Sequence, residues 1–109
     1  MKIFDCTLYY DEDLILEARL NILDSYVDKF IICEASFSHS GRKKELNFDI
    51  NKFPKFKDKI IYTVQETEPK DIIYKDSVEK IEDPSNWRIN AVKRIAHQRN
   101  KLLEEVNKL

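Results

Sequence analysis

Short apolar runs alternate with polar stretches along the first two thirds of the chain, and three of these runs have the composition of β-strands. They are Lys2–Tyr10, Lys29–Cys33 and Lys59–Val64, all rich in Ile, Phe, Tyr, Val or Cys. The second run is apolar at every position after Lys29, which is typical of a strand buried on both faces. We therefore expect this run at the centre of a sheet.

Two segments have apolar residues at helical spacing. In Leu14–Leu23, two rows of apolar residues predict one wide buried stripe, and the acidic run Asp11–Asp13 before it supplies an N-cap candidate. The second helix is predicted to begin near Asp83 or Ser85, either of which can cap it, with Pro84 as a first helical position. Its apolar pattern comprises Val92, Ile95, Ala96, Leu102, Leu103, Val106 and Leu109.

The order strand–helix–strand–loop–strand–loop–helix predicts an α/β fold of about three mostly parallel strands and two main helices, joined by right-handed crossovers. A chain of 109 residues has the length of one domain. The polar segment 65–86, with Pro69 and Pro84, is predicted to be a mobile loop. Ligands of such sheets bind outside the carboxyl ends of the strands, here at Tyr9–Asp13 and Glu34–Lys44.

Charge and composition argue against nucleic acid and membranes as partners. The 19 Lys and Arg residues nearly balance the 20 Asp and Glu residues, so the net charge of -1 creates no field that attracts nucleic acid or an anionic membrane. No stretch approaches the roughly 20 apolar residues of a membrane span, and Asp5 stands where a signal peptide needs an apolar run. We expect a cytoplasmic protein in which Cys6 and Cys33 are buried free thiols.

Residue types exclude several common kinds of site. Gly41 is the only glycine, so neither a Walker phosphate loop nor a GxGxxG dinucleotide motif is possible. His39 and His97 are isolated, and no metal-ligand spacing is present. Serines flank His39, but neighbouring residues of an extended loop point apart and the glycines of a nucleophile elbow are missing, which argues against a nucleophilic serine.

Glu34 ends the second strand on the ligand edge, where an acid commonly accepts hydrogen bonds from ribose hydroxyls in nucleotide-binding α/β folds. An ion pair with Arg42 or Lys43 is the alternative. Gly41 is expected to supply a positive φ for a turn. The cations Arg42–Lys44 form either a solvated turn or a contact with a diphosphate.

Two arginines on the predicted helices are each open to two interpretations. Arg19 lies close to the apolar stripe of the first helix, so it either pairs with Glu34 or Asp5 or remains solvated. Arg99 interrupts the apolar pattern of the last helix, where a planar guanidinium suits either a pair at the edge of the core or a bidentate clamp on a phosphate.

Short segments spread over nearly the whole chain follow the pattern of one known family in order. They are Ile3-Phe4-Asp5-Cys6, Tyr10-Asp11-Glu12, Leu16-Glu17-Ala18-Arg19-Leu20-Asn21-Ile22-Leu23, Val27-Asp28-Lys29-Phe30, Glu34-Ala35-Ser36-Phe37-Ser38, Gly41, Lys59-Ile60-Ile61, Trp87 and Gln98-Arg99-Asn100. In this order the chain resembles glycosyltransferase family 17, the β-1,4-mannosyl-glycoprotein β-1,4-N-acetylglucosaminyltransferases and their relatives.

The resemblance implies a GT-A-like (Rossmann-like) fold and transfer of a sugar, of the N-acetylglucosaminyl type, from a UDP-sugar to a hydroxyl acceptor. It also implies contacts to the donor nucleotide from two loops and the last helix. The expected donor-binding residues are Tyr10, Asp11, Glu12, Glu34, Arg99 and Asn100, supported by Asp5, Arg19 and Gly41.

The family's acidic motif, which holds a divalent cation (Mn or Mg) on the donor diphosphate, should follow the helix that contains Gln98-Arg99-Asn100. No such motif occurs before Leu109. Asp11–Asp13 matches the residue pattern of the motif, but it lies at the start of the first predicted helix and not after the last one. We therefore expect the N-terminal, nucleotide-binding half of a glycosyltransferase domain, incomplete for catalysis alone and prone to self-association or pairing with a complementing second half. The alternatives are a non-catalytic nucleotide- or protein-binding module and a remnant without a ligand.

Overall fold

The computed structural model describes residues 1–76 and 78–109, which form two sheets and two α-helices. The main elements are β1 (Phe4–Tyr9), α1 (Asp13–Leu23), β2 (Lys29–Ala35), β3 (Ile60–Gln65), β4 (Tyr74–Asp76), β5 (Ile81–Glu82) and α2 (Trp87–Asn107). Short 3₁₀ turns are η1 (Ile50–Lys52), η2 (Pro54–Phe56) and η3 (Pro84–Asn86).

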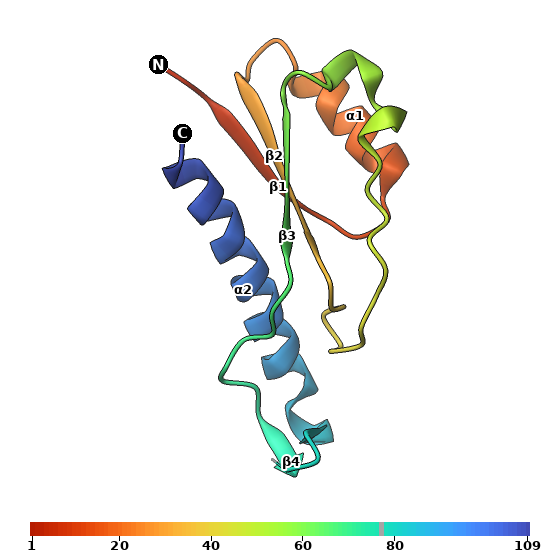
Figure 1. The fold of residues 1–109 in the computed structure, drawn as a ribbon, viewed down its shortest axis with the longest axis vertical. Helices are drawn as coiled ribbons and strands as arrows, with labels where there is room; N and C mark the ends of the chain where they lie inside the picture. The colour runs from red at the N-terminus through yellow and green to blue at the C-terminus, as the bar shows by residue number, and fades with distance from the viewer. Residues whose placement is uncertain (77) are drawn as a thin grey trace.

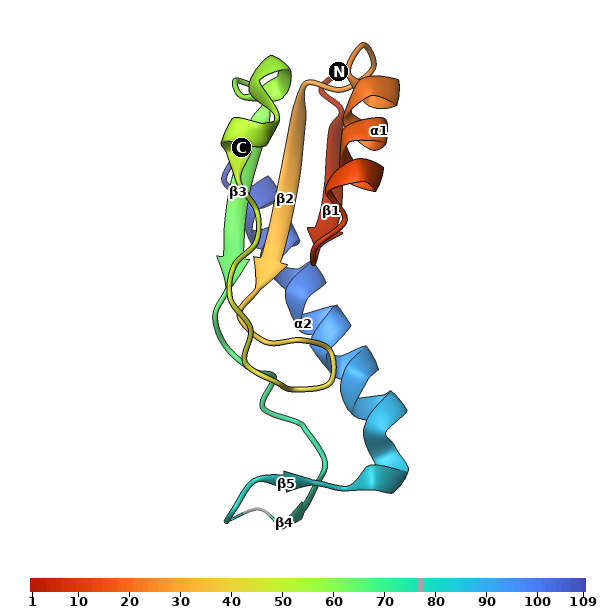
Figure 2. The ribbon, with the colours of Figure 1, turned by 90° about the vertical axis from the view of Figure 1, so that its right-hand side faces the viewer.

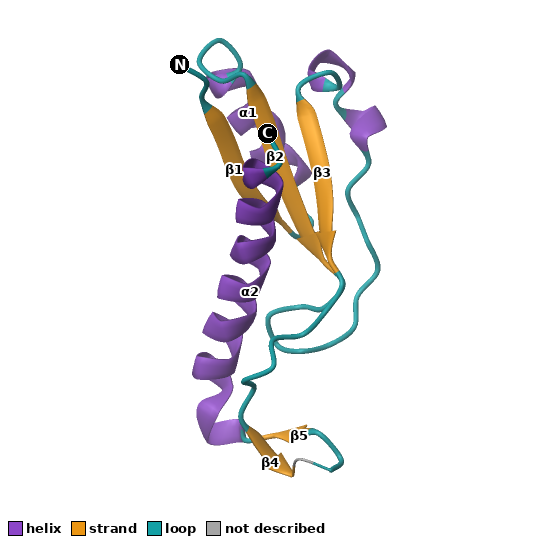
Figure 3. Cartoon of the chain, turned by 60° about the vertical axis from the view of Figure 1, so that its left-hand side comes forward, coloured by secondary structure: helices purple, strands orange, loops and turns teal. Residues whose placement is uncertain are grey.

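The central sheet has the order β1-β2-β3 and is parallel throughout. α1, η1 and η2 cover one face, and α2 lies along the other and continues beyond the strands to the β4–β5 hairpin (Figures 1 and 3). The predicted α/β class, the three parallel strands and the two helices are therefore confirmed. β2 is the central strand, as its continuous apolar run predicts.

Alternate residues of β2 build the core on both faces of the sheet. Phe30 and Ile32 pack with Leu16 and Leu20 of α1, while Ile31 and Cys33 pack with α2. Only one of the two apolar rows predicted for α1 is buried. The second row, formed by Ile15, Ala18 and Ile22, faces solvent because only one face of a short helix reaches the sheet, and Leu14 is exposed as well.

The buried face of α2 is mostly polar, in contrast to the apolar pattern that predicted the helix. Its buried residues are Asn90, Arg94, Gln98 and Leu102, which follow one another at intervals of four. Val92 and Leu103, members of the predicted apolar pattern, are more than half exposed. The helix follows a 3₁₀ turn whose N-cap is Asp83, so the predicted start lies one short turn before α2 itself.

The segment 65–86, predicted as a mobile loop, contains a small antiparallel hairpin formed by β4 and β5. Asn90 holds this region to α2: its Oδ1 accepts from Ile73 N (2.8 Å), and its Nδ2 donates to Ile73 O (3.0 Å) and Glu82 Oε1 (3.1 Å). Asn90 is completely buried, so these bonds replace the hydration of its amide. The mobility itself stays a prediction.

The prediction that both cysteines are buried is wrong for Cys6. β1 is an edge strand, so Cys6 is exposed on its face toward α2, whereas Cys33 of the central strand is buried.

Self-association through an edge strand such as β1 stays a prediction that sedimentation can test. Within residues 1–76 and 78–109, neither helix combines the length and the apolar character that crossing a bilayer requires.

Thiol labelling should separate the two cysteines. We expect one thiol, Cys6, to react with an aromatic disulfide reagent in the native protein and Cys33 to react only after unfolding. Burial raises the pKa of Cys33 to about 11, while partial burial and the Asp5 carboxylate raise the pKa of Cys6. Native labelling should therefore accelerate with rising pH, and Cys6→Ser should abolish it. Native labelling that persists in Cys6→Ser would contradict the burial of Cys33.

Candidate functional site

The carboxyl ends of the three parallel strands lie at one edge of the sheet, where Tyr9 is opposite Glu34 and Ala35 is opposite Gln65. The loop that follows β2 folds back across this edge (Figure 2). Gly41 makes that return possible, with a φ of 89° and a main-chain N–H donated to Ser38 O at 2.9 Å. The turn predicted at Gly41 is confirmed.

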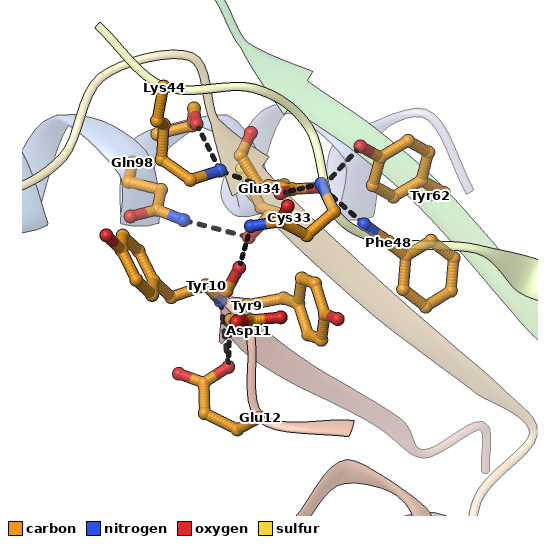
Figure 4. A network of polar contacts seen from close by, with 12 residues as sticks. Tyr9, Tyr10, Asp11, Glu12, Cys33, Glu34, Lys44, Phe48, Tyr62 and Gln98 are labelled. Atoms are coloured by element: carbon orange, nitrogen blue, oxygen red, sulfur yellow. Dashed lines mark hydrogen bonds and ion pairs between the residues drawn. The ribbon is translucent and has the colours of Figure 1, made fainter.

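Glu34 is fully buried at this edge, and both of its carboxylate oxygens are occupied (Figure 4). Oε2 accepts from Lys44 Nζ (2.7 Å) and from the main-chain N of Asn47 (2.6 Å). Oε1 accepts from the main-chain N of Phe48 (3.0 Å) and from the Tyr62 hydroxyl (2.8 Å). One carboxylate thus holds the return of the loop and the side chain of β3 in place.

The ionised form of Glu34 is strongly favoured by this environment. Burial acts to raise its pKa, but the Lys44 ammonium, the two main-chain amides and the Tyr62 hydroxyl outweigh burial, and the pKa lies below its ordinary value. The cationic partner is Lys44, so the predicted alternative pairs with Arg42 or Lys43 are wrong. Arg42 and Lys43 are exposed because they occupy the outer side of the Gly41 turn.

The loop after β1 approaches the same edge. Glu12 Oε2 accepts from the main-chain N–H groups of Tyr10 (2.8 Å) and Asp11 (3.0 Å), which bends the chain into the start of α1. Asn47 Nδ2 donates to Tyr10 O at 3.0 Å and joins this loop to the one that Glu34 holds. The Lys44 ammonium lies 5.3 Å from the centre of the Tyr10 ring, and Tyr10 is 52% exposed.

A small hollow of about 50 Å³ lies between these two loops and α2. Its walls come from both ends of the chain: Leu8, Tyr9, Tyr10, Glu12, Ala35, Phe37, His39, Lys44 and Gln98. The structure therefore brings Tyr10 and Glu12, two of the predicted site residues, together with Lys44, His39 and Gln98. Their proximity depends on α2 crossing the sheet, which no local sequence pattern reports.

Arg94 of α2 fixes the loop on the far side of this hollow. Its guanidinium is buried and donates to Glu68 Oε2 (3.0 Å), Glu82 Oε2 (2.5 Å) and the main-chain O of His39 (3.2 Å). The two carboxylates outweigh burial and raise the pKa of Arg94, so it stays charged. A Cβ added to Gly41 would lie 2.5 Å from Arg94 Nη2, so this glycine also permits the loop to approach the cluster.

The remaining predicted residues lie apart from the hollow. Arg19 binds Asp5 through two hydrogen bonds of 2.6 Å, Nε to Oδ2 and Nη2 to Oδ1, which confirms one of its two predicted partners. Arg99 lines a larger groove of about 560 Å³ together with Arg19 of α1 and Cys6 of β1. Asn100 is exposed on another side of α2. The described structure does not bring Arg99 and Asn100 to the Tyr10 loop.

The divalent cation implied by the resemblance has no ligand set among the described residues. Within 1–76 and 78–109, no three His, Cys, Asp or Glu side chains are grouped so that they could hold a metal. Asp13, in the acidic run after β1, is engaged by the Tyr9 hydroxyl and by Lys52 Nζ (2.9 Å). The residues present do not fit a metal at this edge.

Comparison with known proteins points to one family. The family model described as glycosyltransferase family 17 matches residues 1–103, which is most of the chain. Neither the search of curated proteins nor the search of solved structures found a match.

Proposed function

Because this chain belongs to glycosyltransferase family 17, we propose that it binds a nucleotide-sugar donor, a UDP-sugar, at the carboxyl edge of β1 and β2. We further propose that the sugar is N-acetylglucosamine and the acceptor a hydroxyl group. The observation that carries the proposal is the cluster of Tyr10, Lys44 and Glu12 beside one hollow at the edge where parallel α/β sheets bind ligands.

Tyr10 and Lys44 suit the two chemically distinct parts of a nucleoside diphosphate. The exposed ring of Tyr10 offers a flat surface on which a base can stack. The Lys44 ammonium has three donors, of which one goes to Glu34 (2.7 Å) and one to Ala35 O (3.2 Å). The third donor is left for a phosphate oxygen. We therefore propose Lys44 as the member of the run Arg42–Lys44 that contacts the diphosphate.

Glu34 supports this site by positioning Lys44. Direct contact between Glu34 and a ribose hydroxyl requires one of its four donors to leave, since each oxygen already accepts two hydrogen bonds. We therefore propose that Glu34 acts through the loop that it holds. Contacts from Asp11, Arg99 and Asn100 to the nucleotide remain predictions from the resemblance.

The proposed site concerns donor binding alone, since the described residues supply no ligand set for a cation on the diphosphate. We accordingly assign no catalytic residue. The second candidate function, a non-catalytic nucleotide-binding module, makes the same binding prediction. Hydrolysis or transfer of UDP-N-acetylglucosamine, measured with and without Mn²⁺, distinguishes the two: turnover supports the enzyme, and binding without turnover supports the module for this chain.

Calorimetric titration of UDP and UDP-N-acetylglucosamine tests donor binding. We expect both to bind, and Tyr10→Ala to weaken the binding of UDP about tenfold because a stacked base loses its partner. Tyr26→Ala is the matched control, since Tyr26 is also exposed (70%) and lies between α1 and β2, away from the hollow. Absence of binding to either ligand, or equal effects of the two substitutions, would overturn the proposed site.

A further inference from the structure

His39 is held on two sides by α2, although its sequence context argues against a nucleophilic site. Its ring Nε2 lies 3.1 Å from Gln98 Oε1, and its main-chain O accepts from Arg94 Nη1 at 3.2 Å. Gln98 is 3% exposed and Arg94 is 6% exposed, so both contacts come from buried side chains. The imidazole is thereby fixed at the wall of the hollow.

The hydrogen-bond partners of Gln98 determine the tautomer of His39. Gln98 Nε2 donates to Cys33 O at 2.8 Å, and a main-chain carbonyl can only accept, so the amide orientation is fixed. Gln98 Oε1 therefore faces His39 and can itself only accept. It follows that Nε2 of His39 carries the hydrogen, and that Nδ1 of the neutral ring is an acceptor.

Nδ1 of His39 is left for a ligand. Among the described residues Nδ1 has no hydrogen-bond partner. It is therefore in contact with solvent, because every buried side-chain nitrogen or oxygen of those residues has a partner. The hollow that the ring lines, about 50 Å³, has room for a hydroxyl group. A hydroxyl donates the hydrogen bond that a neutral Nδ1 accepts.

We propose that His39 is a donor-contacting residue whose Nδ1 accepts a hydrogen bond from a hydroxyl group of the bound nucleotide sugar. This inference rests on the proposed function. In this arrangement the base lies on Tyr10, a phosphate oxygen meets Lys44, and one hydroxyl enters the hollow beside His39. The hydroxyl belongs either to the ribose or to the transferred sugar, and the titration below separates the two sources.

Two substitutions of His39 separate the two ring nitrogens. In His39→Gln the side-chain amide reaches the position of Nε2 and keeps a donor for Gln98, but the acceptor at Nδ1 is lost. In His39→Asn the shorter amide places an oxygen near the position of Nδ1 and loses the contact with Gln98. Thermal unfolding of both variants shows whether the loop is retained.

Calorimetry at pH 8 with UDP, 2′-deoxy-UDP and UDP-N-acetylglucosamine gives the test. If the contact is to a ribose hydroxyl, we expect His39→Gln to weaken UDP binding about fivefold. The substitution should not change the binding of an analogue that lacks the contacting hydroxyl, which is 2′-deoxy-UDP when the contact is to the 2′-hydroxyl. For a sugar hydroxyl, the loss should occur for UDP-N-acetylglucosamine and not for UDP. His39→Asn should retain more of the affinity than His39→Gln.

If folded His39→Gln bound every ligand with wild-type affinity, the inference would be overturned. The proposed donor site would still be tested separately by Tyr10→Ala. Absence of ligand binding by the wild-type protein would overturn the proposed function and the inference together. Long-range ¹H–¹⁵N NMR gives a readout without ligand, because it identifies the tautomer of each of the two histidines. We expect the Nε2–H tautomer for His39, and an Nδ1–H tautomer would contradict the argument.

Discussion

Replacing Glu34 by alanine is expected to lower the free energy of unfolding by about 3–5 kcal/mol, the usual cost of removing one partner from a buried ion pair. Glu34 is completely buried, and its removal leaves the Tyr62 hydroxyl and two main-chain amides without this acceptor and the Lys44 ammonium without its carboxylate partner. Urea unfolding followed by circular dichroism measures the loss. Glu45→Ala, in the exposed part of the same loop, is the control and should change stability little.

The effect of Glu34→Ala should depend on pH in a defined direction. The pKa of Glu34 is lowered in the folded protein, so the stabilisation is fully present above the pKa of the unfolded chain, about 4.3, and is lost as pH falls through the folded value. The difference between wild type and Glu34→Ala should thus be constant from pH 6 to pH 8 and shrink below about pH 4. A difference that grows on acidification would contradict the assigned ionised state.

Replacing Arg94 by methionine is expected to cost about 3 kcal/mol or more of unfolding free energy, because Glu68 and Glu82 lose a shared cation. Methionine keeps much of the side-chain volume, so the loss reports the charge and its hydrogen bonds. Exposed Arg88 on the same helix is the matched control, and Arg88→Met should be nearly neutral. Equal small losses in both variants would show that the cluster contributes no net stability.

Gly41→Ala reports on the same cluster from the loop side. Alanine at a φ of 89° is strained, and its methyl would lie 2.5 Å from Arg94 Nη2. We expect a loss of roughly 2 kcal/mol or more, part of which should disappear in the Arg94→Met background, because the contact with the guanidinium is removed there while the contact with Glu82 Oε2 (2.6 Å) remains. Strictly additive losses in the double mutant would mean that contact with the Arg94 guanidinium is not what requires glycine at this position.

The central sheet, the two α-helices and the loop-bearing edge of the sheet are predictable from local patterns, whereas the β4–β5 hairpin lies in a segment predicted as a loop. The continuous apolar run of β2 predicts a central strand, and strand–helix–strand order predicts a parallel sheet whose carboxyl edge receives loops. The turn at Gly41 also follows from local rules, whereas the sequence left Arg19 open between Glu34, Asp5 and solvent, and the structure selects Asp5. Each of the predictable features depends on neighbours in sequence or on one short crossover, so periodicity and residue type suffice.

Other features depend on contacts between segments far apart in the chain. The last helix was predicted from its apolar residues, yet the face toward the protein is formed by Asn90, Arg94 and Gln98. Those side chains bond to main-chain and carboxylate groups of loops, which no helical periodicity can report. The predicted ribose acceptor Glu34 is saturated by three donors of a loop ten to fourteen residues later and by the Tyr62 hydroxyl of β3.

The sequence by itself determined the three parallel strands, the two α-helices and the edge of the sheet at which a ligand can bind, because hydrophobic burial repeats with the period of each of these elements. Only the tertiary structure decided which polar groups remain available there. Buried donors and acceptors must all be paired, and pairing consumed both oxygens of Glu34 while leaving one donor of Lys44 and the Nδ1 of His39. Which partner satisfies which group is set by three-dimensional proximity, and for that reason it is not visible in the order of the residues.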